Sequence, residues 1–151
     1  KAILIDSGAT AGSYCADITR TVPVSGKFRN KRFRELYELV LHCNALGRKH
    51  ARPGITINEL NDIAWQPIID AGLKRHHGLS HHIGMDVHDP SDYNIPLAAG
   101  MIISNEPGVY LADEEIGIRI EDDLLITDKG CDELSKAIPK SVAAIEKLMA
   151  G

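Results

Sequence analysis

Four acidic residues in this chain are spaced so that they would form two facing pairs on neighbouring strands. They are Asp6, Asp17, Glu106 and Glu121. A hairpin that turns at Ala11–Gly12 would set the first two opposite each other, and one that turns at Asp113–Glu114 would do the same for the last two. Like charges directly opposite one another destabilise a sheet. Two such pairs among apolar neighbours therefore predict a compensating cation.

The donor atoms of these side chains, together with an imidazole, favour a pair of divalent ions. Carboxylate oxygens and a histidine nitrogen form a hard ligand set suited to Mn²⁺, Fe²⁺, Co²⁺ or Zn²⁺. Two ions are expected because four carboxylate charges exceed what one divalent cation neutralises. The alternative is that the acidic residues are solvated surface groups, as most single carboxylates are. Their arrangement in two pairs favours the metal.

Five of the seven histidines fall within one short segment, residues 76–88. A lone histidine is more often a structural or surface residue than a ligand, but this density indicates a functional segment. In an extended chain, His77 and His81 would share one face and His88 would lie on the other. Turns would break that alternation, so it does not identify the ligand.

The order of apolar periodicities predicts an α+β fold. Strand patterns occupy residues 2–7, 14–24, 101–110 and 116–127, with a short strand expected within 73–92. Helical periodicity covers about 30–50, and a capping box at Thr56 and Glu59 begins a second helix. A third helix is expected from Pro139 to Met149. This order predicts a mixed or antiparallel sheet with helices packed on one face.

Composition places the chain among ordinary globular proteins. Its 151 residues suit one domain with a real core. The formal net charge of −4 argues against nucleic acid as a partner. No apolar run approaches the roughly 18 residues of a membrane span, so no membrane partner is expected. The three cysteines lack disulfide-framework or zinc spacing and suit free thiols in a reducing compartment, which predicts a cytoplasmic protein.

Five short blocks of sequence surround the acidic residues and histidines. In chain order they are Ile5-Asp6-Ser7-Gly8, Ala16-Asp17-Ile18-Thr19-Arg20-Thr21, His77-Gly78-Leu79-Ser80-His81, Asn105-Glu106-Pro107-Gly108 and Ile118-Arg119-Ile120-Glu121-Asp122-Asp123. They resemble, in order, the metal-binding motifs of the metallopeptidase family with the pita-bread fold, which includes methionine aminopeptidase, prolidase and aminopeptidase P. One block alone would be weak, but five together are a strong signal.

The resemblance implies a complete set of five metal ligands. Asp6 would bind one ion, and His81 with Glu106 would bind the other. Asp17 and Glu121 would bridge or serve both. The expected cofactors are two divalent metal ions, Mn²⁺ first, with Co²⁺, Zn²⁺ or Fe²⁺ as alternatives.

The resemblance also implies roles for residues around the ligands. His88 would contact the substrate carbonyl and the tetrahedral intermediate, and His77 would be a further active-site histidine. Arg119 would orient the acidic ligands. Glu106 is the expected general base. Tyr110 matches a tyrosine near the metal site, although a core position is an equal alternative.

The run from His77 to Asp89 resembles aminopeptidase P more than prolidase. The expected activity is removal of the N-terminal residue from peptides with proline in second position. A prolidase acting on Xaa-Pro dipeptides and a non-catalytic peptide- or protein-binding module of the same fold are the alternatives. Association into a homo-oligomer is compatible with the sequence.

The sequence departs from the family's pattern at its N-terminal end. The full fold has two similar α/β halves, and its first half precedes the strand that carries Asp6. That half, an upstream active-site histidine and the family's N-terminal domain are absent from these residues. Residues 1–151 are therefore expected to be a single domain that forms the second part of a pita-bread catalytic domain. Its pocket is expected to be incomplete, so the isolated fragment could be inactive.

Overall fold

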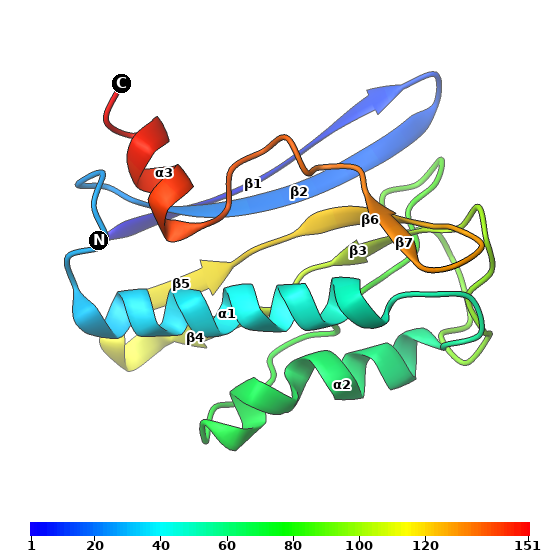
Figure 1. Cartoon of the computed structure of the whole chain (residues 1–151), viewed down its shortest axis with the longest axis horizontal. Helices are drawn as coiled ribbons and strands as arrows, with labels where there is room; N and C mark the ends of the chain where they lie inside the picture. The colour runs from blue at the N-terminus through cyan, green and yellow to red at the C-terminus, as the bar shows by residue number, and fades with distance from the viewer.

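The computed structural model describes all residues from 1 to 151. Its strands are β1 (Ala2–Ala11), β2 (Tyr14–Pro23), β3 (Ile102–Asn105), β4 (Gly108–Leu111), β5 (Ile116–Arg119), β6 (Asp122–Ile126) and β7 (Cys131–Glu133). Its helices are α1 (Lys31–His50), α2 (Ile57–Asp70), α3 (Val142–Leu148) and the short 3₁₀ helix η1 (Ala112–Glu114). Every strand pairing is antiparallel, and Figure 1 shows the arrangement. The predicted α+β fold class is confirmed.

Each α-helix begins at a polar residue whose side chain caps the first turn. Asn30 caps α1, and Thr56 with Glu59 forms the predicted capping box of α2. Ser141 caps α3. The start predicted at Pro139 is therefore wrong, because the serine hydroxyl further along the chain accepts the hydrogen bond that an exposed helical amide needs.

Strands β1 and β2 form a regular hairpin whose register differs from the prediction. Its loop is Gly12–Ser13, and both residues have positive φ, 55° and 70°. A two-residue loop with left-handed backbone at both positions matches the twist of the flanking strands. The predicted turn at Ala11–Gly12 is therefore wrong, and Asp6 faces Thr19 rather than Asp17.

The second hairpin keeps the predicted register but is interrupted in the middle. β4 pairs with β5, and β3 pairs with β6, in one continuous register around the turn at η1. Pro107 has no amide hydrogen to donate, and its carbonyl accepts from the amide of Ile120 at 3.3 Å. The single strand predicted over 116–127 is therefore two strands, β5 and β6. Strand β7, which pairs with β6, was not predicted.

Residues 73–92 have little regular structure but are held along β3. The predicted short strand is reduced to isolated bridges from His82 to Asp89 and to Ile103. Next to them, the amide of Ser104 donates to the carbonyl of His81 at 2.9 Å. This contact fixes the backbone of the histidine segment against the sheet.

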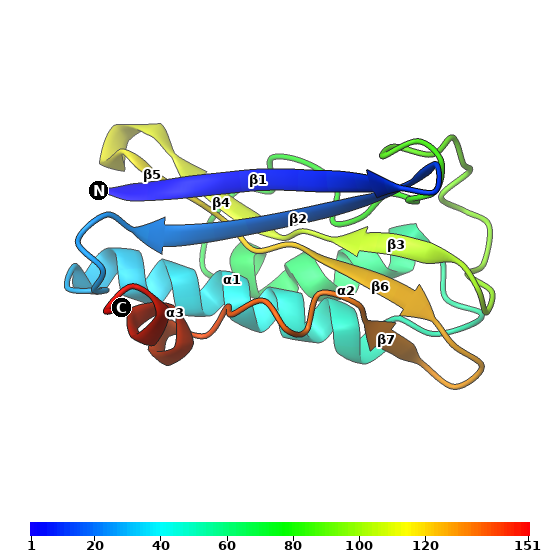
Figure 2. The same ribbon diagram turned by 90° about the horizontal axis from the view of Figure 1, so that it is seen from above.

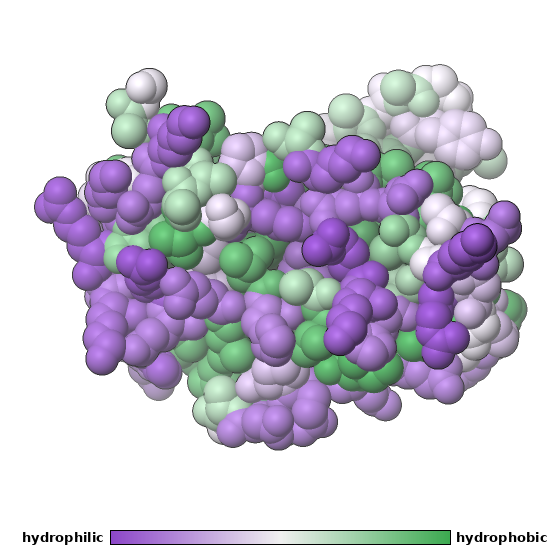
Figure 3. Space-filling view, in the orientation of Figure 1, coloured by the Kyte–Doolittle hydropathy of each residue, from purple (hydrophilic) through white to green (hydrophobic).

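The helices cover one side of the strands, as the sequence predicted (Figure 2). The core includes Tyr37 and Trp65 from the helices and Ile103 and Ile118 from the strands, all fully buried. The face that α1 and α2 present to solvent is mostly hydrophilic (Figure 3). No helix combines the length and apolar character that a membrane span requires. The helices thus support the sheet from one side and leave the site residues to its other side.

Candidate metal centre

The first hairpin presents two of the predicted ligands on one face of the sheet. Asp6 pairs with Thr19, and Asp17 lies two residues before Thr19 on β2. Side chains two residues apart on a strand point to the same face, so Asp6 and Asp17 are diagonal neighbours. The two carboxylates that the sequence placed directly opposite each other are therefore still neighbours, but they are offset by two residues along the strands.

The gap in the second hairpin frees the backbone of the other two carboxylates. Glu106 and Glu121 lie between the two ladders, opposite each other in the register. The amide of Glu121 donates instead to the carbonyl of Thr19 at 3.0 Å, and the amide of Glu106 donates to the carbonyl of Leu79 at 2.8 Å. Glu121 thereby joins the sheet to the first hairpin, and Glu106 joins it to the histidine segment.

His81 points its free ring nitrogen at these carboxylates. Its Nδ1 lies 3.1 Å from the carbonyl of His82, and a carbonyl can only accept a hydrogen bond. The neutral ring therefore carries its proton on Nδ1 and leaves a lone pair on Nε2. Nε2 lies 3.3 Å from Oε1 of Glu106 and 3.6 Å from Oδ2 of Asp17. This is the orientation that a metal-ligating histidine needs.

The ligand atoms form three overlapping groups, in each of which they all lie within 4.8 Å of one another. The groups are Asp6, Asp17 and Glu121; His81, Glu106 and Glu121; and Asp17, His81 and His88. The structure therefore brings all five predicted metal ligands together. It adds His88, whose ring stacks on that of His81 with 3.9 Å between centroids.

Burial and mutual repulsion raise the pKa values of the carboxylates in this cluster. Burial raises the pKa of Glu106 to about 7 and that of Glu121 to about 8, where the charge of Glu106 adds to the rise. Burial also raises the pKa of Asp17, and the charge of Asp6 reinforces it. Burial lowers the pKa of His81, which favours the neutral form that ligates metals. The donor set and its charge therefore fit divalent cations.

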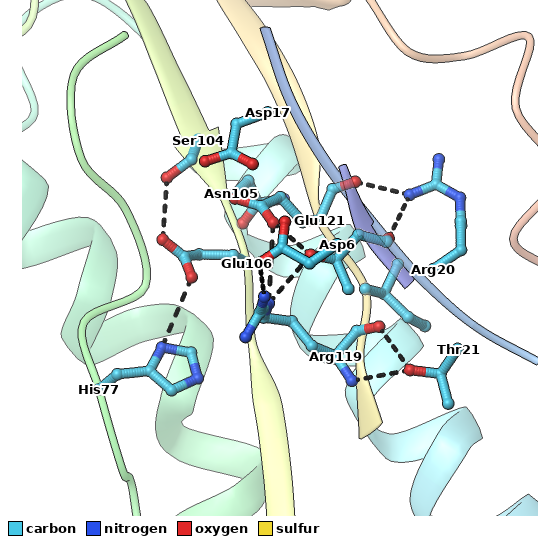
Figure 4. A network of polar contacts seen from close by, with 12 residues as sticks. Asp6, Asp17, Arg20, Thr21, His77, Ser104, Asn105, Glu106, Arg119 and Glu121 are labelled. Carbon is cyan, nitrogen blue, oxygen red and sulfur yellow. Dashed lines mark hydrogen bonds and ion pairs between the residues drawn. The ribbon is translucent and has the colours of Figure 1, made fainter. Parts of the chain in front are cut away.

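Two of the residues predicted around the ligands, His77 and Arg119, lie next to the carboxylates (Figure 4). His77 places Nε2 3.0 Å from the hydroxyl of Tyr110 and Nδ1 3.7 Å from Oε2 of Glu106. Arg119 donates from Nη1 to Tyr110 at 3.2 Å and from Nη2 to Oδ2 of Asp6. Tyr110 therefore lies beside the cluster, which decides between the two positions left open by the sequence.

Three residues of the site were not singled out from the sequence. Thr19 donates to Glu121, Ser104 donates to Glu106, and Asp123 accepts from the amide of Asp17. Thr19 and Ser104 each lie two residues from a predicted ligand, Asp17 or Glu106. The period of two along a strand could therefore have found both.

Comparison with known proteins agrees with this geometry. The model of metallopeptidase family M24 matches residues 1–128. The Xaa-Pro aminopeptidase of Haemophilus influenzae is 38% identical over 97% of this chain and 41% of its own length. The Xaa-Pro dipeptidase of Pyrococcus furiosus is 39% identical over 89% of this chain and 39% of its own length.

A solved structure shows the same fold. Escherichia coli aminopeptidase P with the inhibitor Pro-Leu superposes with a TM-score of 0.92 and 35% identity, over 99% of this chain and 41% of that one. The chain thus spans about two fifths of the length of the relatives it matches. The resemblance seen in the five sequence blocks is confirmed: the chain belongs to metallopeptidase family M24.

Proposed function

We propose that the full-length protein is a metal-dependent peptidase that removes the N-terminal residue from peptides with proline in the second position. The observation that carries this proposal is the convergence of four carboxylates and one imidazole in overlapping groups of ligand atoms. The printed names of the relatives, Xaa-Pro aminopeptidase and aminopeptidase P, support the substrate class.

Membership in a metallopeptidase family implies the use of divalent metal. For its ligands we propose Asp6, Asp17, His81, Glu106 and Glu121. We propose that they bind two divalent ions. Mn²⁺ is the first candidate because carboxylate oxygens dominate the ligand set, and Co²⁺, Zn²⁺ and Fe²⁺ are the alternatives. Such ions supply Lewis acidity and lower the pKa of a water molecule to near-neutral values.

Glu106 is the proposed acceptor of a proton from the attacking water. Its Oε1 accepts from the hydroxyl of Ser104 at 3.3 Å, and its Oε2 lies 3.7 Å from Nδ1 of His77. The hydroxyl of Ser104 thus holds one oxygen of a carboxylate whose side chain is 16% exposed, and the ring of His77 lies near the other. A carboxylate held through one oxygen keeps the other available to take a proton.

His88 and Arg119 are proposed to act on the substrate and on the ligands, respectively. His88 is exposed and stacks on His81, so its ring is available to donate a hydrogen bond to a carbonyl that gains negative charge. Arg119 lies behind the carboxylates and bonds to Asp6, Tyr110 and Thr19. It therefore orients Asp6 rather than touching the peptide.

A dipeptidase acting on Xaa-Pro is the second candidate. The identity with the Pyrococcus furiosus Xaa-Pro dipeptidase is 39% over 89% of this chain, against 38% over 97% for the Haemophilus influenzae aminopeptidase. Both activities would use the same ligands and cleave before proline. They differ in whether a residue after the proline is accepted.

A comparison of three peptides separates these candidates. The full-length protein loaded with Mn²⁺ is assayed on a tripeptide with proline second, on the matching Xaa-Pro dipeptide, and on the same tripeptide with alanine second. We expect kcat/KM for the proline tripeptide to exceed both others by at least about tenfold. A preference for the dipeptide would establish the dipeptidase. Binding of the peptides without hydrolysis would contradict both and favour a non-catalytic module.

A further inference from the structure

We propose that Thr19 is a positioning residue that connects Arg119 to Glu121 and thereby fixes the Glu121 carboxylate for metal binding. This inference rests on the metal site proposed above. It concerns a neutral side chain that bonds to one of the proposed ligands, Glu121.

The position of Thr19 on β2 places it at the centre of the cluster. It faces Asp6 across the hairpin and follows Asp17 by two residues, so its side chain lies on the same face as both carboxylates. Thr19 is fully buried, with 0% of its surface exposed. A buried hydroxyl must be satisfied by neighbouring groups, because no water reaches it.

The direction of the hydrogen bonds at Thr19 follows from the chemistry of its neighbours. The Nε of Arg119 lies 3.0 Å from Oγ1, and a guanidinium can only donate. The hydroxyl therefore accepts from Arg119, and its single hydrogen is available for Oε2 of Glu121 at 2.6 Å. Nε of Arg119 is 3.7 Å from that same oxygen, which is too long for a direct hydrogen bond. Thr19 is thus the link between the cation and the carboxylate.

This link holds one carboxylate oxygen of Glu121 and leaves the other free. The only side-chain hydrogen bond of Glu121 in the structure is the one that Oε2 accepts from Thr19. The guanidinium of Arg119 also bonds to Asp6. Arg119 and Thr19 therefore set the distance between two carboxylates that lie in one group of ligand atoms, Asp6 and Glu121.

Thr21 provides an internal control with the same residue type on the same strand. It is also fully buried, and its Oγ1 donates to the carbonyl of Arg119 at 2.9 Å and accepts from the amide of Arg119 at 3.0 Å. Both contacts are with backbone, so Thr21 joins β2 to β5 without touching a carboxylate. Loss of its hydroxyl should affect stability but not metal affinity.

Four proteins test the inference: the full-length wild type, Thr19→Val, Thr19→Ser and Thr21→Val. Valine keeps the shape of threonine and removes the hydroxyl, whereas serine keeps the hydroxyl. Mn²⁺ affinity is measured by titration calorimetry, the Co²⁺ form by visible absorption, and folding by circular dichroism after chelation. We expect Thr19→Val to weaken Mn²⁺ binding about ten- to hundredfold and to change the Co²⁺ spectrum, as loss of a ligand-orienting partner does. Thr19→Ser should restore most of the affinity.

The outcomes distinguish this inference from the proposed function. Wild-type affinity in Thr19→Val would overturn the inference and leave the metal site intact. An equal loss in Thr21→Val would also overturn it, because the effect would then come from the strand. A wild type that binds neither Mn²⁺ nor Co²⁺ would overturn both proposals. If Thr19→Val does not fold, Thr19→Ala takes its place in the same comparison.

Discussion

The two hairpins of this protein present their carboxylates in different ways. The first has an unbroken ladder, and simple alternation along its strands sets Asp6 and Asp17 on one face. The second is interrupted at Glu106 and Glu121, whose amides bond to other segments of the chain. The side chain of Asp6 is 48% exposed, whereas that of Glu121 is 2% exposed.

This difference shows what an interruption in a ladder can achieve. A regular hairpin fixes only the face on which a side chain lies. A gap leaves backbone amides free to donate to other segments. The amide of Glu121 therefore bonds to the first hairpin, and the amide of Glu106 bonds to the histidine segment. The consequence is a buried carboxylate with a pKa of about 8, which gains more from a cation than an exposed one does.

The largest expected effect separates the buried carboxylate from the exposed one. Glu121 belongs to two of the three groups of ligand atoms and Asp6 to one. We expect Glu121→Gln to weaken Mn²⁺ binding by more than about a hundredfold, beyond what loss of an orienting partner costs. Asp6→Asn should weaken it by about tenfold. Titration calorimetry on both variants measures this, and equal losses would contradict the contrast between the hairpins.

Metal binding should also stabilise the fold, with an effect that depends on Glu121. At a free Mn²⁺ concentration of one hundred times Kd, the free energy of unfolding should rise by about 2.7 kcal/mol. At the same concentration, Glu121→Gln should lose most of this gain. Thermal unfolding with Mn²⁺ and with a chelator measures both. An identical metal-induced shift in wild type and variant would show that Glu121 is not a ligand.

The sequence predicted which residues converge better than it predicted their arrangement. The register of the second hairpin was correct because its turn was placed at η1, and the five blocks contain the acidic residues and the histidine that the structure brings together. The register of the first was wrong because Ser13 adopts a positive φ, which is uncommon for serine and cannot be inferred from its type. The interruption of the second hairpin could not be predicted, since it depends on acceptors from distant segments, Thr19 and Leu79.

The histidine segment shows the same limit. Alternation along an extended chain would place His81 and His88 on opposite faces, but their rings stack in the folded protein. The chain bends between them, where the amide of Gly84 donates to the carbonyl of Asp86 at 3.1 Å. Residue spacing therefore identified a dense segment, and tertiary contacts decided which rings meet.

Gly8 tests how far the regular hairpin depends on close approach of its strands. A Cβ at this position would lie 2.1 Å from the carbonyl oxygen of Ala16, next to Asp17. We expect Gly8→Ala to lower the free energy of unfolding by about 1–3 kcal/mol, because a backbone atom must move. Mn²⁺ affinity should fall as Asp17 is displaced. Chemical denaturation and calorimetry measure the two effects.

The matched control for this variant is Gly130→Ala. No atom lies within 4 Å of a Cβ at Gly130, so this substitution should change stability little. If Gly8→Ala is as stable as Gly130→Ala and binds Mn²⁺ equally well, the first hairpin tolerates displacement of its backbone next to Asp17. Its regular ladder would then contribute less to the site than the interrupted one.

The smallest expected effect concerns Tyr110, whose hydroxyl connects the histidine segment to Arg119 without touching a proposed ligand. Its oxygen lies 3.0 Å from Nε2 of His77 and 3.2 Å from Nη1 of Arg119. Tyr110→Phe should lower the free energy of unfolding by about 0.5–1.5 kcal/mol and lower kcat by up to about tenfold. Mn²⁺ affinity should be retained. Tyr93→Phe, at an exposed tyrosine, is the control. A loss of Mn²⁺ affinity as large as that of Glu121→Gln would mean that the orientation of Arg119, rather than the interrupted ladder, holds the ligands in place.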